Sequence, residues 1–159
     1  MTDDAHTQSL QDRFAPASIC YGCGPANQAG LQIKSFPAGD ELLTEWQAEA
    51  KYQAFPGVLY GGLIGSLLDC HMNWTAAWHL MQKQALDAPP CTVTATYTVK
   101  FLRPTAFDRP VRLVARVSAT PKDDRAEVRA ELYSGDELCA TGEGLFVAVK
   151  PGHPAYHRW

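Results

Sequence analysis

Asp69 is a carboxylate set among small and uncharged residues. It lies within residues 61–80, GGLIGSLLDCHMNWTAAWHL, a stretch without proline whose residues sort by face at about 100° per residue, as in a helix. Gly62, Ser66 and Asn73 share the face of Asp69. Because carboxylates are seldom buried without a partner or a task, this face predicts a reacting or binding group. The alternative is a carboxylate that pairs with a cation across an interface.

The larger residues of the same stretch lie on other sides of the predicted helix. His71 is two residues from Asp69 and therefore points away from it, so we expect a buried histidine held by hydrogen bonds rather than a base that works with Asp69. Trp74 and Trp78 fall on the apolar side, and we expect them to pack against a sheet as core.

Five cysteines offer sulfur ligands, but only Cys20 and Cys23 form a CxxC pair. A structural zinc site needs four ligands, and Cys70, His71 or Cys91 could complete one only if folding happened to bring them there. We therefore expect no metal, and a turn packed near the site instead. An odd number of cysteines without a secretory context favours free thiols over a disulfide framework.

The chain has 159 residues, of which 46% are hydrophobic and 19% charged, as expected for one globular domain. A net charge of −3 without runs of Lys or Arg gives no electrostatic footprint for nucleic acid. No apolar run approaches the roughly 20 residues of a membrane helix, and the polar start MTDDAHTQSLQDRF does not resemble a signal peptide. We expect a cytoplasmic protein with no nucleic-acid or membrane partner.

Two predicted strands precede the helix and four follow it. Alternating runs bounded by turn residues predict strands at 31–36, 42–48, 92–101, 111–118, 126–133 and 138–149. Residues 1–18 are expected to form a loose tail or a short docking helix, 19–150 a single domain, and 151–159 a C-terminal tail. Residues 37–40, PAGD, suit a hairpin turn, and Gly142 and Gly144 suggest a bulge or sharp coiling in the last strand.

Residues 92–101 alternate throughout, with apolar residues on one face and four threonines with Lys100 on the other, which we expect to be architecture. Short connections imply antiparallel neighbours. The predicted fold class is therefore α+β, with one curled antiparallel sheet of about six strands around one long central helix. One sheet covers only one face of that helix, and a second copy of the chain is the simplest cover for the small, polar face.

The predicted order β-β-α-β-β-β-β resembles the hotdog fold. Residues 55–69, FPGVLYGGLIGSLLD, are similar to the signature of the PaaI-like acyl-CoA thioesterases of the 4-hydroxybenzoyl-CoA thioesterase superfamily. That family usually has His-Gly-Gly, with an acidic residue nine positions after the histidine. Residues 101–104, FLRP, and 20–24, CYGCG, are also similar to the family pattern, and the resemblance covers roughly residues 20–149.

The resemblance implies a hydrolase that cleaves the thioester of a small or medium acyl-CoA. It makes Asp69 the catalytic general base or nucleophile, and Gly61 the residue whose backbone N–H polarises the thioester carbonyl. Tyr60, Gly62 and Asn73 are expected to contact the substrate. No metal or redox cofactor is expected, because coenzyme A is part of the substrate.

Two departures from the family pattern favour an alternative. Tyr60 stands in place of the usual histidine, and it donates a hydrogen bond but does not titrate near neutral pH. Ala54, beside Gln53, stands where some relatives carry asparagine. The alternative is a non-catalytic hotdog protein that binds acyl-CoA or another small ligand. A hotdog hydratase ranks last, because the Asp–His spacing of those enzymes is missing around this helix.

The spacing of Gly61 and Asp69 predicts a site built from two chains. Thioester hydrolysis places negative charge on the carbonyl oxygen, which an unpaired N–H at a helix start can stabilise. The two residues are eight positions apart, about 12 Å along one helix at 1.5 Å per residue. Two antiparallel helices across a dimer would bring them to one carbonyl. The intersubunit site of the family implies the same arrangement, in a homodimer or a dimer of dimers.

The arginines Arg103, Arg112 and Arg116 could receive the phosphates of coenzyme A. Solvated charges on strand faces are the more common explanation.

Overall fold

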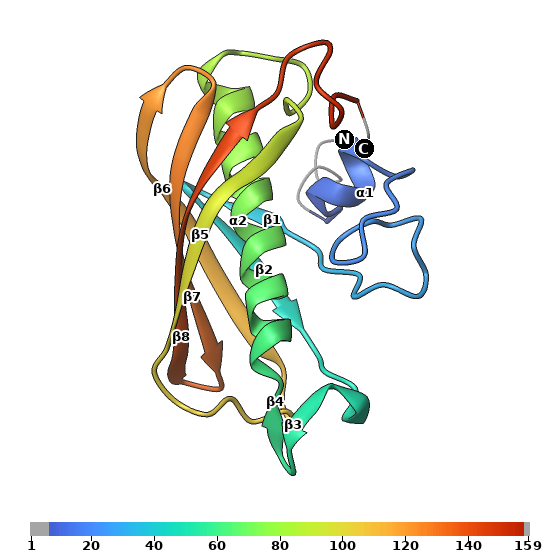
Figure 1. Cartoon of the computed structure of the whole chain (residues 1–159), viewed down its shortest axis with the longest axis vertical. Helices are drawn as coiled ribbons and strands as arrows, with labels where there is room; N and C mark the ends of the chain where they lie inside the picture. Colours follow the sequence, from blue (N-terminus) through green and yellow to red (C-terminus); the bar gives the residue numbers. More distant parts are fainter. Residues whose placement is uncertain (1–6, 158–159) are drawn as a thin grey trace.

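In this computed structural model, which describes residues 7–157, the long helix α2 (Gly61–Lys83) lies along one face of a six-stranded sheet (Figure 1). The sheet order is β1-β2-β6-β7-β8-β5, and all neighbouring pairs are antiparallel. Its strands are β1 (Phe36–Ala38), β2 (Glu41–Trp46), β5 (Thr92–Phe101), β6 (Val111–Lys122), β7 (Arg125–Ser134) and β8 (Glu137–Ala148). This confirms the predicted hotdog fold with one central helix.

A short hairpin leads into the central helix. It is formed by β3 (Gln53–Phe55) and β4 (Val58–Leu59), and it follows a 3₁₀ turn at Ala50–Tyr52. The sequence did not predict these strands, because each is too short to show a periodicity. No helix within residues 7–157 is both long enough and apolar enough to cross a membrane.

The N-terminal part of the chain covers a second side of α2, away from the sheet (Figure 1). Of the two alternatives for this stretch, the structure shows a short helix, α1 (Leu10–Phe14). Ser9 caps it by accepting a hydrogen bond from the N–H of Asp12 at 3.1 Å. Leu10 is buried, and the ring of Phe14 lies 6.4 Å from that of Trp78 on α2.

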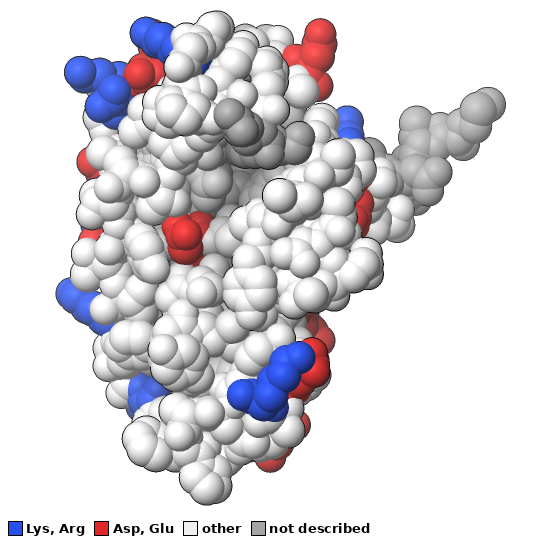
Figure 2. Space-filling model, turned by 45° about the vertical axis from the view of Figure 1, so that its right-hand side comes forward, with Lys and Arg blue, Asp and Glu red and all other residues white. Residues whose placement is uncertain are grey.

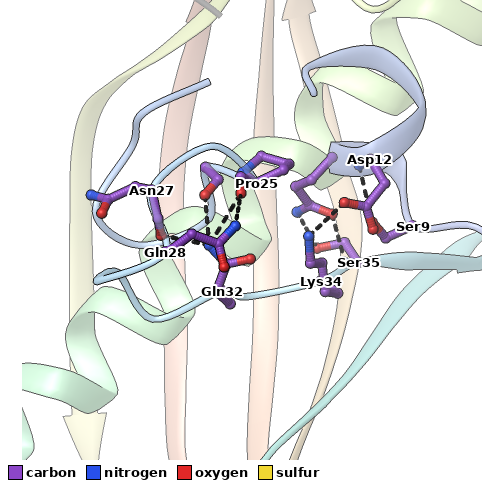
Figure 3. Close-up of polar contacts among 10 residues, drawn as sticks. Ser9, Asp12, Pro25, Asn27, Gln28, Gln32, Lys34 and Ser35 are labelled. Atoms are coloured by element: carbon purple, nitrogen blue, oxygen red, sulfur yellow. Dashed lines mark hydrogen bonds and ion pairs between the residues drawn. The ribbon is translucent and has the colours of Figure 1, made fainter. Parts of the chain in front are cut away.

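Polar contacts fix α1 to the segment that leads into the sheet (Figure 3). Lys34 pairs with Asp12 at 2.6 Å. The buried amide of Gln11 accepts a hydrogen bond from the N–H of Ser35 at 2.8 Å and donates one to its hydroxyl at 3.1 Å. The N-terminal helix is therefore held by paired hydrogen bonds as well as by apolar contact.

The strand predicted at 31–36 is wrong except at its last residue. The N–H groups of Leu31 and Ile33 donate to the carbonyls of Tyr21 and Gly22, so this segment pairs with the cysteine-containing loop instead of the sheet. Gln32 between them has a φ of 55°, which no continuous strand allows. Its side-chain amide donates to three loop carbonyls, those of Gly24, Pro25 and Asn27 (Figure 3).

The predicted hairpin turn is confirmed within residues 37–40, at Gly39 and Asp40. Strands β1 and β2 pair directly, from Phe36 opposite Leu43 to Ala38 opposite Glu41. The turn between them contains Gly39, whose φ of 65° is readily accessible to glycine.

Strand β5 contains a bulge that the alternating sequence pattern did not reveal. Thr94 pairs with Phe146 of β8, and the next paired residue, Thr96, lies opposite Leu145. Ala95 is therefore an extra residue on β5, and the alternation of faces shifts by one position after it.

The shift changes which residues of β5 face the helix. Before the bulge, Thr94 reaches Asp69 on α2. After the bulge, Tyr97 faces α2 instead, and its hydroxyl lies 3.5 Å from the position that a Cβ on Gly65 would take. The predicted uninterrupted alternation over residues 92–101 is therefore wrong.

Small residues let α2 approach the sheet closely. A Cβ on Gly142 of β8 would lie 3.1 Å from Cε of Met72 and 3.5 Å from Cδ1 of Leu68, so this glycine makes room for the helix. Trp74 is buried in the core and Trp78 packs against it, as predicted, but both also contact the N-terminal part of the chain. Trp74 lines a cavity with residues of the N-terminal loop, and Trp78 packs on α1.

Candidate active site

Asp69 lies half-buried on α2, beside a cavity of about 310 Å³ between the helix and the N-terminal loop. The cavity is lined by Ser18, Ile19, Cys20, Cys23, Asp69, Cys70, Asn73 and Trp74, none of which is cationic. Figure 2 shows this side of the molecule, with one acidic patch in a hollow surrounded by uncharged atoms. A second depression of about 350 Å³ lies over the strands, at Arg129 and Glu143, which pair with each other.

The hydroxyl of Thr94 donates to Oδ1 of Asp69 at 2.7 Å. Burial raises the pKa of the Asp69 carboxyl above its ordinary value, the hydrogen bond from Thr94 opposes this shift, and the negative charge of Cys20 adds to it. A carboxylate with a raised pKa beside a cavity is typical of a general base or a nucleophile. The sequence did not identify Thr94 as a site residue. The bulge at Ala95 shifts the faces of β5, so Thr94 points toward α2 although the alternating pattern placed it on the same face as the threonines after the bulge.

Asn73 lies one helical turn after Asp69 and lines the same cavity. Its amide donates to the carbonyl of Thr92, the first residue of β5, at 3.3 Å. Its Oδ1 is buried and accepts no hydrogen bond within the described chain. A buried acceptor of this kind calls for a donor from solvent or from a ligand.

Gly61 is the first residue of α2, as the spacing of the motif requires. The N–H groups of Leu63 and Ile64 both donate to the carbonyl of Tyr60, at 3.1 and 3.3 Å. Tyr60 is the N-cap, and its side chain makes no capping hydrogen bond. The first N–H groups of an α-helix have no acceptor within the helix itself. Within residues 7–157, no other acceptor is found for the N–H groups of Gly61 and Gly62.

The side chain of Tyr60 is folded over the helix start. A Cβ on Gly62 would lie 2.6 Å from Cε1 and 2.8 Å from the hydroxyl of Tyr60, so only glycine leaves room for this ring. Tyr60 is 57% exposed, which leaves its hydroxyl accessible. A Cβ on Gly61 would lie 3.4 Å from the ring of Phe101, at the end of β5.

His71 is fully buried and held on both sides, as predicted. Its Nε2 lies 2.9 Å from the carbonyl of Leu42, which can only accept, so Nε2 carries the proton. Nδ1 then accepts from the hydroxyl of Ser35 at 2.9 Å. Burial lowers the pKa of His71 to about 4, and the bond to Leu42 offsets only part of this effect. It is a neutral structural residue at pH 7.

Folding does bring a third cysteine to the CxxC pair. The sulfur atoms of Cys20, Cys23 and Cys70 lie within 4.8 Å of one another, and those of Cys20 and Cys70 are 4.0 Å apart. Hydrogen bonds from the thiols of Cys23 and Cys70, with that of Cys23 the stronger influence, hold the pKa of Cys20 far below its ordinary value. The bond to Cys20 raises the pKa of each donor thiol in turn. The cysteines of the described chain are all free thiols.

The other residues considered from the sequence lie away from the cavity. The amide of Gln53 accepts from the N–H of Gly57 at 2.7 Å and so closes the β3–β4 hairpin. Arg103 and Arg116 are exposed and pair with Glu137 and Glu41, as solvated strand charges do.

Comparisons with known proteins agree with the fold. A family model described as the thioesterase superfamily matches residues 56–141, which is more than half of the chain. No curated protein matches the chain by sequence.

Solved structures of thioesterase superfamily proteins are similar to the chain. One from Shewanella loihica PV-4 is 28% identical, with a TM-score of 0.63 over 79% of this chain and 98% of its own. A phenylacetic acid degradation-related protein from Ralstonia eutropha JMP134 is 21% identical, with a TM-score of 0.64 over 80% of this chain and 92% of its own. The PaaI protein from the phenylacetic acid degradation operon of E. coli is 17% identical, with a TM-score of 0.62 over 76% of this chain and 81% of its own.

The glycine pair at the start of α2, the acidic residue eight positions after Gly61 and strands β5, β6 and β7 fall within the residues that the family model matches. The chain therefore belongs to the thioesterase superfamily and has the hotdog fold.

Proposed function

We propose that the protein hydrolyses the thioester bond of a small or medium acyl-CoA at a site shared by two copies of the chain. The observation that carries this proposal is the position of Asp69. It is a half-buried carboxylate beside a cavity, held at one oxygen by Thr94, on the helix whose start leaves two N–H groups unpaired. The acyl-CoA is the proposed substrate, and the hydrolysis as proposed uses no metal or redox cofactor.

Each part of the proposed site has a defined task. The N–H of Gly61 donates to the thioester carbonyl oxygen and stabilises the negative charge that develops on it. Asp69 either takes a proton from the attacking water or attacks the carbonyl carbon itself, and water then releases the acid. In both routes the C–S bond breaks, and coenzyme A leaves with a free thiol. Tyr60 and Gly62 at the helix start, and Asn73 with its unpaired Oδ1, are proposed to contact the substrate.

The distance along α2 supports a site made by two chains. Gly61 and Asp69 are separated by about 12 Å on one helix, too far to act on one carbonyl. Strand β5 ends the sheet, with one edge free of any partner strand in the described chain. Pairing of two β5 edges would extend the sheet and place the two α2 helices antiparallel. A homodimer, alone or within a dimer of dimers, is therefore part of the proposal.

The first test is substitution of Asp69 by Asn, assayed as thiol release from a panel of short, long and aromatic acyl-CoAs. We expect turnover to fall by about 10²-fold or more, as for removal of a general base. Glu143→Gln is the matched control, because it neutralises an exposed carboxylate that pairs with Arg129. Undiminished hydrolysis by a folded Asp69→Asn protein would refute the assignment.

The second test concerns the helix start. Gly61→Pro removes the N–H at the first helical position, where proline is well tolerated, and Tyr60 already has the extended conformation that a following proline needs. Gly61→Ala keeps the N–H and adds a Cβ at an ordinary contact distance. We expect the Pro variant to lose most activity and the Ala variant to keep it.

Mixing the two defects distinguishes a shared site from one within a chain. A heterodimer of Gly61→Pro and Asp69→Asn chains contains one intact site if each site uses both chains. Random exchange of equal amounts should then restore about a quarter of the wild-type sites. No recovery in mixtures shown to contain heterodimers would place both residues of a site in one chain.

The exposed position of Tyr60, in place of the usual histidine, favours one alternative, a protein that binds acyl-CoA without cleaving it. Tight binding of acyl-CoA by the wild type with no thiol release would select that function.

A further inference from the structure

Three of the five cysteines meet at one point although they come from two distant parts of the chain. Cys20 and Cys23 belong to the loop that follows α1, and Cys70 belongs to α2. Their sulfur atoms lie within 4.8 Å of one another, and the described chain contains no other such group of three His, Cys, Asp or Glu side chains. Cys139 lies elsewhere, in β8, where its thiol donates to carbonyl oxygens.

The loop is held rigidly against the helix. A Cβ on Gly22 would lie 2.4 Å from the sulfur of Cys70, so only glycine lets the loop backbone lie on this thiol. The N–H of Gly24 donates to the carbonyl of Cys20 at 2.8 Å, and the carbonyl of Gly22 accepts from Ile33 at 3.0 Å. The three sulfur atoms are therefore brought together by fixed backbone, and not by flexible side chains.

The surroundings suit a cation. The cavity beside the three thiols also contains the carboxylate of Asp69 and no Lys or Arg. Cys20 is exposed, so an ion from solvent can reach the group. Thiolates prefer soft metal ions over Mg²⁺ or Ca²⁺.

We propose that Cys20, Cys23 and Cys70 form a binding site for a thiophilic divalent cation, with Zn²⁺ as the expected ion. Tetrahedral Zn²⁺ with Zn–S bonds of about 2.3 Å requires sulfur atoms roughly 3.8 Å apart. The 4.0 Å between Cys20 and Cys70 is close to this value. The fourth ligand comes from the cavity, as solvent or as the carboxylate of Asp69. The proposal rests on the positions of the three sulfur atoms and not on the proposed hydrolysis, in which none of the three cysteines takes part.

Cadmium titration of the whole protein, reduced and stripped of metal by a chelator, provides the test. The sulfur-to-cadmium charge-transfer absorbance should rise until one ion is bound per chain, and Zn²⁺ should displace it while Mg²⁺ should not. Cys20→Ser changes an exposed residue and should weaken cadmium binding roughly 100-fold or more. Substitution of a residue that only hydrogen-bonds to a metal ligand already lowers metal affinity about 10–100-fold, so loss of a ligand should lower it further. Cys139→Ser is the matched control and should bind as the wild type does.

Cys70→Ser serves as a second variant, with thermal unfolding to show that it is folded. Asp69→Asn identifies the fourth ligand, because it keeps the three sulfur ligands. Weaker cadmium binding than in the wild type assigns the carboxylate as this ligand, and equal binding assigns solvent. The proposal is overturned if the wild type shows no saturable cadmium absorbance. Equal affinity in Cys20→Ser, Cys139→Ser and wild type overturns it as well.

Discussion

At the scale of single residues, the hydroxyl of Thr94 holds one oxygen of the proposed catalytic carboxylate. Thr94→Val removes this donor at nearly constant volume. A hydrogen bond to a charged group contributes about 1.5–3 kcal/mol, so we expect kcat to fall roughly tenfold or more while KM changes little. Steady-state kinetics with the best acyl-CoA measure this. Thr94→Ser, which keeps the hydroxyl, should retain most of the activity, and a Val variant with wild-type kcat would contradict the role.

His71 makes stability depend on pH. Its pKa is about 4 in the folded protein because of burial, against an ordinary value of 6.5. Between these values the unfolded chain binds more protons, so stability is fully present above pH 6.5 and is lost as the pH falls toward 4. Protonation of His71 over this pH range lowers the free energy of unfolding by about 3 kcal/mol. Urea unfolding from pH 7 to pH 4 in EDTA should show it, and His71→Asn should flatten that part of the curve.

At the scale of elements, glycines fix the cysteine-containing loop. A Cβ on Gly24 would lie 2.4 Å from both the N–H of Cys20 and the carbonyl oxygen of Ser18, and backbone atoms cannot move aside as a side-chain end can. Gly24→Ala should therefore lower the free energy of unfolding by about 2 kcal/mol or more. Denaturant titration measures this. Gln28→Ala, at an exposed position of the same loop, should cost under about 1 kcal/mol, and equal effects would argue against a rigid loop.

The elements that could be predicted from the sequence are those with a local cause. The period of 3.6 over residues 61–80 and the period of two in β6 and β7 arise from neighbours in the chain, and the helix observed is Gly61–Lys83. The bulge at Ala95 and the pairing of Leu31 with Tyr21 depend on contacts with distant segments. The same holds for the site: Asp69 and Gly61 were identified from their motif, whereas Thr94 and the meeting of Cys70 with the CxxC pair required the folded chain.

At the scale of the whole molecule, the free edge of β5 carries exposed apolar rings. Phe101 is 58% and Tyr97 41% exposed, beside the open face of α2. If two copies cover this face, as proposed, the double change Tyr97→Glu with Phe101→Glu buries charge in the interface and should convert dimer to monomer. Sedimentation velocity measures the shift. Leu86→Glu changes a residue that is also 41% exposed, beyond the end of α2, and should leave the mass unchanged. A double variant that sediments as wild type would argue against this interface.

The buried hydrogen bonds from Gln11 through Ser35 and His71 to Leu42 run in one direction only. Each group donates to the next, because the carbonyl at the end can only accept, and this fixes the tautomer of the imidazole. His71 is thereby a spectroscopic reporter inside the fold. The resonance of its unprotonated Nδ1 depends on the hydrogen bond that this nitrogen accepts from Ser35. One side chain thus indicates whether the N-terminal segment is docked on the central helix.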